Sequence, residues 1–132
     1  MEKNLKNAMI AISLIGFVIS LYLTAYHYAG IPLICQNSGI INCANVLNSQ
    51  YAYILGIPVA LLGLAFFIVE IALVMHWKER GMMLLWNMLG LGFVIYFLYA
   101  EYSIGNICEY CTIVHLAVIS LLLLSAYDFA KS

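Results

Sequence analysis

Four long apolar runs constrain the fold of this chain more than any other feature of its sequence. They cover residues 8–29, 57–77, 82–100 and 108–127, and each approaches the roughly 20 residues that a helix needs to cross a bilayer. Because 66% of the residues are hydrophobic and only 8% are charged, the chain cannot present the charged surface of a water-soluble domain. We therefore predict an all-α integral membrane protein in which residues 1–132 form a single four-transmembrane-helix bundle.

The basic residues predict how this bundle lies in the membrane. An even number of spans puts both termini on the same side, and this threading places all five lysines and arginines there as well. The positive-inside rule then assigns that side to the cytoplasm of a plasma-membrane protein, with the connections 30–56 and 101–107 outside the cell. Five basic residues are too few for a nucleic-acid surface, so lipid is the expected surrounding. The five are Lys3, Lys6, Lys78, Arg80 and Lys131.

The connection 30–56 contains no formally charged residue, yet its amide and hydroxyl side chains make it too polar to cross lipid. We expect it to lie on the membrane surface over the outer end of the bundle. Within it, Cys43–Tyr53 is expected to form a short interfacial helix with tyrosines anchored at the depth of the lipid headgroups. The second span then begins at Ile57, with Pro58 in its first turn.

All four cysteines fall in or beside the connections predicted to face outside the cell, where disulfides form and persist. Cys35 and Cys43 lie on the surface connection, while Cys108 and Cys111 form a Cys-x-x-Cys pair at the start of the fourth span. The unbonded N–H groups and the dipole of a helix start favour thiolates at such a pair, which makes it reactive. Two structural disulfides or a zinc site are the alternatives, although seven residues between Cys35 and Cys43 exceed the usual zinc spacing.

Two dithiols on one face of the membrane can exchange and pass electrons to a two-electron acceptor that is soluble in the membrane, such as a quinone. Cys111 lies about one helical turn deeper than Cys108, so it is the better candidate for contact with the quinone. Within the spans, we expect Glu70 to be protonated or paired and Asn87 to bridge helices by hydrogen bonding. The residues therefore favour a thiol oxidoreductase over a purely structural use of the cysteines.

The spacing of these residues also carries a resemblance. Seven residues separate Cys35 from Cys43, Ser49 follows Cys43 by six residues, and Gly56 opens the second span. The pair at the fourth span reads Cys108-Glu109-Tyr110-Cys111. In combination, the chain resembles the vitamin K epoxide reductase family, in its small prokaryotic form without a fused thioredoxin-like domain. The resemblance covers nearly the whole chain and implies an enzyme that forms disulfides with a quinone.

The resemblance further implies roles for individual residues. Electrons enter at Cys35 from a separate thioredoxin-like protein and pass through Cys43 to Cys108. The last cysteine of the relay then reacts with the quinone, either ubiquinone or menaquinone, and no metal is implied. The residues implied to contact the quinone are Cys111, Ser49 and His115. His115 stands where vertebrate members carry a tyrosine, and helix packing is the alternative role for it, as helix capping is for Ser49.

Three alternatives stay open at this point. Vertebrate members of the family reduce an epoxide and carry an asparagine in the second span, whereas residues 57–77 contain none. A disulfide-stapled bundle without enzymatic activity is the second alternative, and quinone turnover discriminates it from an oxidoreductase. An inverted topology that oxidises cytoplasmic proteins is the third, and the positions of the basic residues argue against it.

Overall fold

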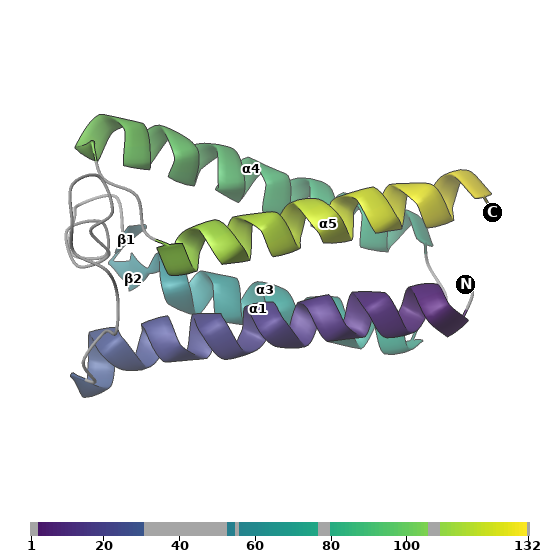
Figure 1. Cartoon of the computed structure of the whole chain (residues 1–132), viewed down its shortest axis with the longest axis horizontal. Coiled ribbons are helices and arrows are strands. Elements are labelled where there is room, and N and C mark those ends of the chain that lie inside the picture. The colour runs from purple at the N-terminus through teal and green to yellow at the C-terminus, as the bar shows by residue number, and fades with distance from the viewer. Residues whose placement is uncertain (1–2, 31–52, 55, 77–79, 106–108, 132) are drawn as a thin grey trace.

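The computed structural model contains four long helices whose directions alternate along the chain (Figure 1). It describes residues 3–30, 53–54, 56–76, 80–105 and 109–131. Each helix is long and apolar enough to cross a bilayer, so the predicted all-α bundle of membrane helices is confirmed. The helices are α1 (Lys3–Ala29), α3 (Val59–His76), α4 (Arg80–Ile104) and α5 (Glu109–Lys131).

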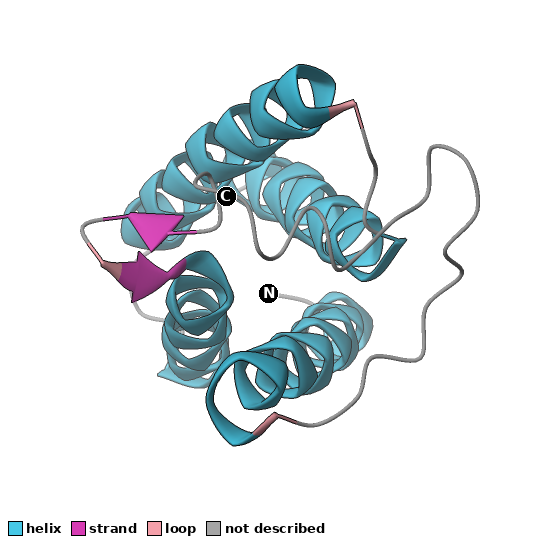
Figure 2. Cartoon of the chain, turned by 90° about the vertical axis from the view of Figure 1, so that its left-hand side faces the viewer, coloured by secondary structure: helices cyan, strands magenta, loops and turns pink. Residues whose placement is uncertain are grey.

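The helices pack around two phenylalanines of α3. Helix α1 packs against α3 and α5, α4 packs against α5, and α3 contacts α4 less extensively (Figure 2). The ring of Phe67 is fully buried and faces α1, where a Cβ atom on Gly16 would overlap it. The ring of Phe66 faces α4, where a Cβ atom on Gly90 would come within 2.7 Å of it. The two glycines therefore allow α1 and α4 to approach α3 closely.

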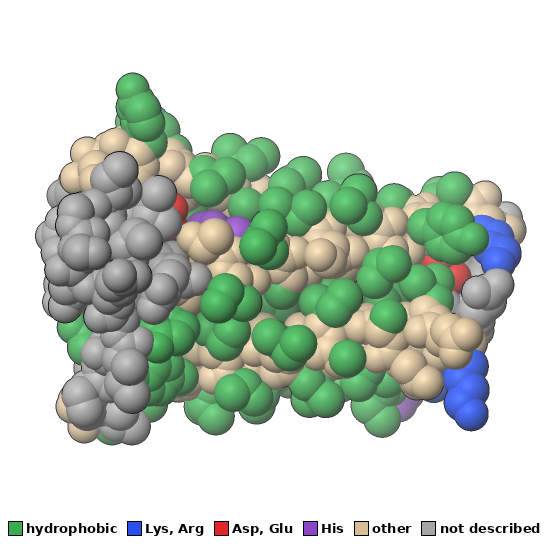
Figure 3. All heavy atoms as spheres, in the orientation of Figure 1, with side chains coloured by type: hydrophobic (Ala, Val, Ile, Leu, Met, Phe, Trp, Pro, Cys, Tyr) green, Lys and Arg blue, Asp and Glu red, His purple; other side chains and the backbone are tan. Residues whose placement is uncertain are grey.

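The two ends of the bundle differ in chemical character. Both chain termini lie at one end, which we call the terminal end (Figure 1). Helix α5 begins at the opposite end, which we call the cysteine end because Cys111 lies there. On the face shown in Figure 3, basic side chains gather at the terminal end and hydrophobic side chains cover the length of the helices. All four helices expose large hydrophobic residues, as expected where lipid surrounds a bundle.

Two helices end at glycines and one of them extends past its predicted span. Helix α4 continues to Ile104, beyond the predicted limit at residue 100, because the polar residues at its end continue the helical hydrogen bonding. Gly30 follows α1 with a φ of 69°, and Gly105 follows α4 with a φ of 83°, a conformation that other residues rarely adopt. The N–H of Gly105 donates to the carbonyl of Glu101 at 2.9 Å and so completes the last turn of α4.

The second span starts later than predicted. Helix α3 begins at Val59 rather than at Ile57. A proline disfavours helical angles in the residue before it, so Pro58 keeps Ile57 extended. The predicted start of this span was therefore wrong by two residues.

A short hairpin takes the place of that first helical turn. Strand β1 (Tyr53–Ile54) pairs antiparallel with strand β2 (Ile57–Pro58). The turn between them contains Gly56 with a φ of 80°, which suits a tight hairpin connection. Tyr53 thus lies in a strand, and the rest of the expected interfacial helix Cys43–Tyr53 lies outside the described residues.

A buried amide bridges α3 and α4, which confirms the expectation for Asn87. Its Nδ2 atom donates to Oε1 of Glu70 at 3.1 Å and to the carbonyl of Met83 at 2.8 Å. A second polar contact joins the same helices, because Nε1 of Trp86 donates to the carbonyl of Phe66 at 3.2 Å. Hydrogen bonding therefore supports an interface that is less extensive than those of α1 with α3, α4 with α5 and α1 with α5.

A methyl group at Gly16 is expected to destabilise the bundle, whereas a methyl group at Gly92 is not. Both glycines lie inside helices, so replacement by alanine improves helix propensity equally. A Cβ atom at Gly16 overlaps the ring of Phe67, while one at Gly92 meets nothing within 4 Å. We expect Gly16→Ala to be less stable than Gly92→Ala by about 1–3 kcal/mol. Unfolding in detergent followed by circular dichroism measures this difference, and equal stability contradicts the packing of α1 on α3.

Candidate functional site

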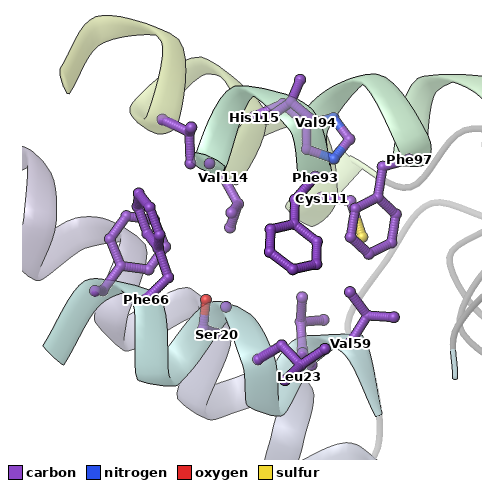
Figure 4. A pocket seen from close by; sticks show the side chains of 16 residues that line it. Ser20, Leu23, Val59, Phe66, Phe93, Val94, Phe97, Cys111, Val114 and His115 are labelled. Carbon is purple, nitrogen blue, oxygen red and sulfur yellow. The ribbon is translucent and has the colours of Figure 1, made fainter. Parts of the chain in front are cut away.

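An apolar cavity lies between the four helices, in the half of the bundle nearer the cysteine end (Figure 4). About 760 Å³ of space between its lining atoms is unoccupied, a volume that includes the part open to the surroundings. Every helix contributes to its wall, and most of the lining side chains are aliphatic or aromatic. The cavity is therefore suited to a flat, apolar molecule that arrives from the membrane.

Cys111 forms part of the cavity wall at the first turn of α5. Only 6% of the residue is exposed, and it packs with Leu23 of α1 in a small apolar cluster. The rings of Tyr22 and Tyr110 meet edge to face beside it, with centroids 5.5 Å apart, and hold the start of α5 against α1. The sulfur therefore lies near the unbonded N–H groups of the helix start.

His115 lies one turn further along α5 and lines the same cavity. Its ring packs against Phe97 of α4 with centroids 5.4 Å apart, and the residue is 6% exposed. In the part of the chain that the structure describes, its ring nitrogens form no hydrogen bond. The imidazole is thus held in place by packing, while its nitrogens stay available to a ligand.

Ser20 of α1 is a cavity residue that the sequence analysis did not single out. It is 2% exposed, and its Oγ atom lies 3.3 Å from where a Cβ atom on Gly63 would stand. The sequence contains a pattern that marks this residue, because Ser13, Ser20 and Thr24 recur at helical spacing in an otherwise apolar span. The hydroxyls of Ser13 and Thr24 donate to carbonyls of their own helix, whereas Ser20 faces the cavity.

The structure brings together two of the predicted site residues, Cys111 and His115, on one wall of the cavity. They lie four residues apart, so they project from the same face of α5. The other predicted site residues lie outside the described part of the chain, and their roles stay predictions. These are Cys35, Cys43, Ser49 and Cys108.

Comparison with known proteins gives a match at the level of a family. The sequence model of the vitamin K epoxide reductase family matches residues 7–126 of the 132-residue chain. The matched region overlaps all four apolar spans and includes every residue that lines the cavity. No curated protein matches the chain.

A planar ring compound that enters the cavity is expected to quench the fluorescence of Trp86. The indole of Trp86 stacks on Phe66 with centroids 5.5 Å apart, and Phe66 lines the cavity. Titration of a Trp77→Phe background with a short-chain quinone isolates this signal. Adding Val94→Phe fills the cavity and is expected to weaken binding about tenfold, or roughly 1.4 kcal/mol. Ile95→Phe is the matched control, because Ile95 is 60% exposed, and equal affinity of the two variants contradicts binding in the cavity.

Proposed function

The chain belongs to the vitamin K epoxide reductase family, and on this premise we propose that it generates disulfides by passing electrons from protein thiols to a membrane quinone. Membership of the family supports a quinone-linked thiol oxidoreductase in general terms. One observation carries the finer proposal: Cys111 and His115 line the same wall of an apolar cavity between the helices.

The residues of the cavity fit the headgroup of a quinone. Phe93 and Phe97 supply aromatic surface to a flat ring, while Ser20 and His115 supply polar groups that can reach a carbonyl oxygen. Bound ubiquinone or menaquinone supplies an acceptor for two electrons and two protons. An apolar lining with a few polar groups is the usual composition of such a site.

Cys111 is the residue that delivers electrons in this proposal. It lies in the first turn of α5, and its thiolate is the form of the cysteine that would react. Burial to 6% exposure keeps water and other oxidants away from the sulfur. As the thiols of Cys108 and Cys111 close into a disulfide, two electrons and two protons leave the pair.

His115 forms a hydrogen bond with an oxygen atom of the quinone in this proposal. A neutral imidazole can donate a hydrogen bond to a carbonyl, and that bond strengthens as negative charge develops on the oxygen. Packing against Phe97 fixes the plane of the ring, so little reorientation accompanies the reaction. His115 also lies about one helical turn from Cys111, a separation that leaves room for a ring between them.

The earlier steps of the relay involve residues outside the described part of the chain. Cys35 and Cys43 are proposed to carry electrons from a separate thioredoxin-like protein to Cys108. The basic side chains at the terminal end support a plasma-membrane protein with cytoplasmic termini. The cysteine end then faces the compartment in which secreted proteins acquire disulfides.

Replacement of Cys111 by alanine is expected to abolish quinone reduction, because no thiolate then lines the cavity. The measurement is anaerobic mixing of reduced protein with ubiquinone or menaquinone, with thiols and quinol counted after a single turnover. Ile113→Ala is the matched control, since Ile113 is 43% exposed on the outside of the same helix and is expected to retain activity. Quinol formation by Cys111→Ala contradicts the assignment, and no thiol loss in the wild type favours a non-enzymatic bundle.

His115→Leu is expected to slow quinol formation about 100-fold, within the range of general acid–base effects. Disulfide exchange at the outer cysteines does not involve the imidazole, so its rate is expected to stay unchanged. Stopped-flow absorbance of quinol and acid-quenched thiol counts separate the two steps. Leu116→Ala, at a neighbouring position that is 60% exposed, controls for general damage to α5. Equal quinol rates in His115→Leu and the wild type remove the histidine from the mechanism.

A further inference from the structure

The half of the bundle nearer the terminal end contains a second buried polar site, which the redox chemistry above does not use. Glu70 of α3 and Asn87 of α4 are each 0% exposed. They lie roughly 10 Å from the terminal ends of their helices, measured along the helix axis. An ionisable side chain at this depth is expensive in lipid, so it points to a function and requires a defined chemical state.

The hydrogen bonds of Asn87 fix the orientation of its amide group. Nδ2 faces two oxygens, Oε1 of Glu70 at 3.1 Å and the carbonyl of Met83 at 2.8 Å. A backbone carbonyl can only accept, so the reversed amide would set Oδ1 against the carbonyl of Met83 and lose that bond. Among the described residues, Oδ1 of Asn87 and Oε2 of Glu70 then remain without a hydrogen-bond partner.

A proton on the carboxyl group would supply the donor that these two acceptors lack. An ionised carboxylate has no hydrogen to donate, so it would leave both of these buried acceptors without a hydrogen bond. Its negative charge would also be buried without an ion pair to any basic residue that the structure describes. A proton on Oε2 is a donor, and Oδ1 of the same amide is an acceptor for it. We propose that Glu70 holds a proton in a neutral acid–amide pair with Asn87 and delivers it from the terminal side to the quinone cavity.

The pair lies one helical turn from the cavity. Glu70 follows Phe66 by four residues and Asn87 precedes Gly90 by three, and both Phe66 and Gly90 line the cavity. One turn corresponds to roughly 5 Å along the helix axis. Only a thin layer of apolar side chains separates the carboxyl from the cavity, and we call it the apolar collar. The collar consists of Phe66, Phe67 and Val118.

A polar stripe on α5 leads from the terminal end to the depth of the pair. Asp128 and Ser125 lie three residues apart and are buried, at 4% and 1% exposure. Ser125 is six residues from the end of α5, as Glu70 is from the end of α3. Among the described residues, the Ser125 hydroxyl has no hydrogen-bond partner, so it is available to pass a proton inward. The stripe thus carries polar groups from the terminal end to about the depth of Glu70, on a different helix.

This inference rests on the proposed function, because reduction of a quinone to a quinol takes up two protons. The transfer occurs twice, once for each quinone oxygen. Each time, the O–H bond at Oε2 of Glu70 breaks, an O–H bond forms on a quinone oxygen, and the carboxylate regains a proton from the terminal side. The electrons come from the dithiol, whose protons leave at the cysteine end. Dithiol and quinone thus become disulfide and quinol, and protons are taken up on one side and released on the other.

Glu70→Gln is the variant that separates proton transfer from structure. A glutamine amide reproduces both hydrogen bonds of the protonated acid with Asn87, yet it has no proton to give. The variant is therefore expected to unfold at the same temperature as the wild type. Ser13→Ala is the matched control, because Ser13 is also 0% exposed but its hydroxyl donates to the carbonyl of Met9 at 2.7 Å.

The first measurement uses proteoliposomes that contain ubiquinone in the bilayer and a pH-sensitive dye in the lumen. Reduced thioredoxin added outside drives only the molecules whose cysteine ends face outward. Wild type and Ser13→Ala are expected to make the lumen alkaline as quinol forms, and Glu70→Gln is expected to do so at least about tenfold more slowly. Quinol without a change of lumen pH in the wild type overturns this proposal alone, whereas absence of quinol overturns the proposed function as well.

Infrared spectroscopy of the resting protein gives a readout that does not depend on turnover. The chain has only six aspartates and glutamates, so the carbonyl stretch of a protonated acid can be assigned by difference. At neutral pH, wild type and Ser13→Ala are expected to show a protonated-acid band that Glu70→Gln lacks. If the spectra of wild type and Glu70→Gln do not differ in this band, Glu70 is ionised and the proposal is overturned.

Discussion

The packing of two phenylalanine rings on two glycines is the interaction on which the rest of this bundle depends. Phe66 and Phe67 lie side by side on α3 with their rings 86° apart, so one ring faces α4 and the other faces α1. Gly90 and Gly16 let the neighbouring backbones approach these rings. The cavity opens on the side of these rings that faces the cysteine end. The same two rings thus set the helix spacing and close the deep side of the candidate site.

The sequence predicts the number and order of the membrane helices because lipid imposes a simple requirement. A span needs enough apolar residues to cross the bilayer and a backbone that satisfies its own hydrogen bonds, and both can be judged locally. The bridging role of Asn87 follows from the same reasoning, since a buried amide must find a partner. The start of α3 was mispredicted because apolar composition does not show that Pro58 holds Ile57 in an extended conformation.

Prediction of the site succeeds where the geometry is local and stops where it depends on helix rotation. Cys111 and His115 are four residues apart, so helical periodicity alone puts them on one wall. Helical spacing marks Ser20 as one of several polar residues in α1, but whether Ser20 or Phe97 reaches the cavity depends on how α1 and α4 turn toward α5. The family resemblance supplied roles for Cys35 and Ser49 that no packing argument could have assigned, and those roles stay predictions.

The apolar collar also determines where the electrical potential of an energised membrane falls. Polar and polarisable groups lie at the terminal end and at the cysteine end, while Phe66, Phe67 and Val118 present only hydrocarbon between them. A voltage drops most steeply across the layer of lowest dielectric, and one elementary charge that crosses 100 mV exchanges about 2.3 kcal/mol with the field. A layer about one helical turn thick therefore concentrates the field within the protein. The side chains that pack the collar therefore also form an insulating layer inside the bundle. The thickness of this layer sets how strongly the membrane voltage acts on any charge that crosses it.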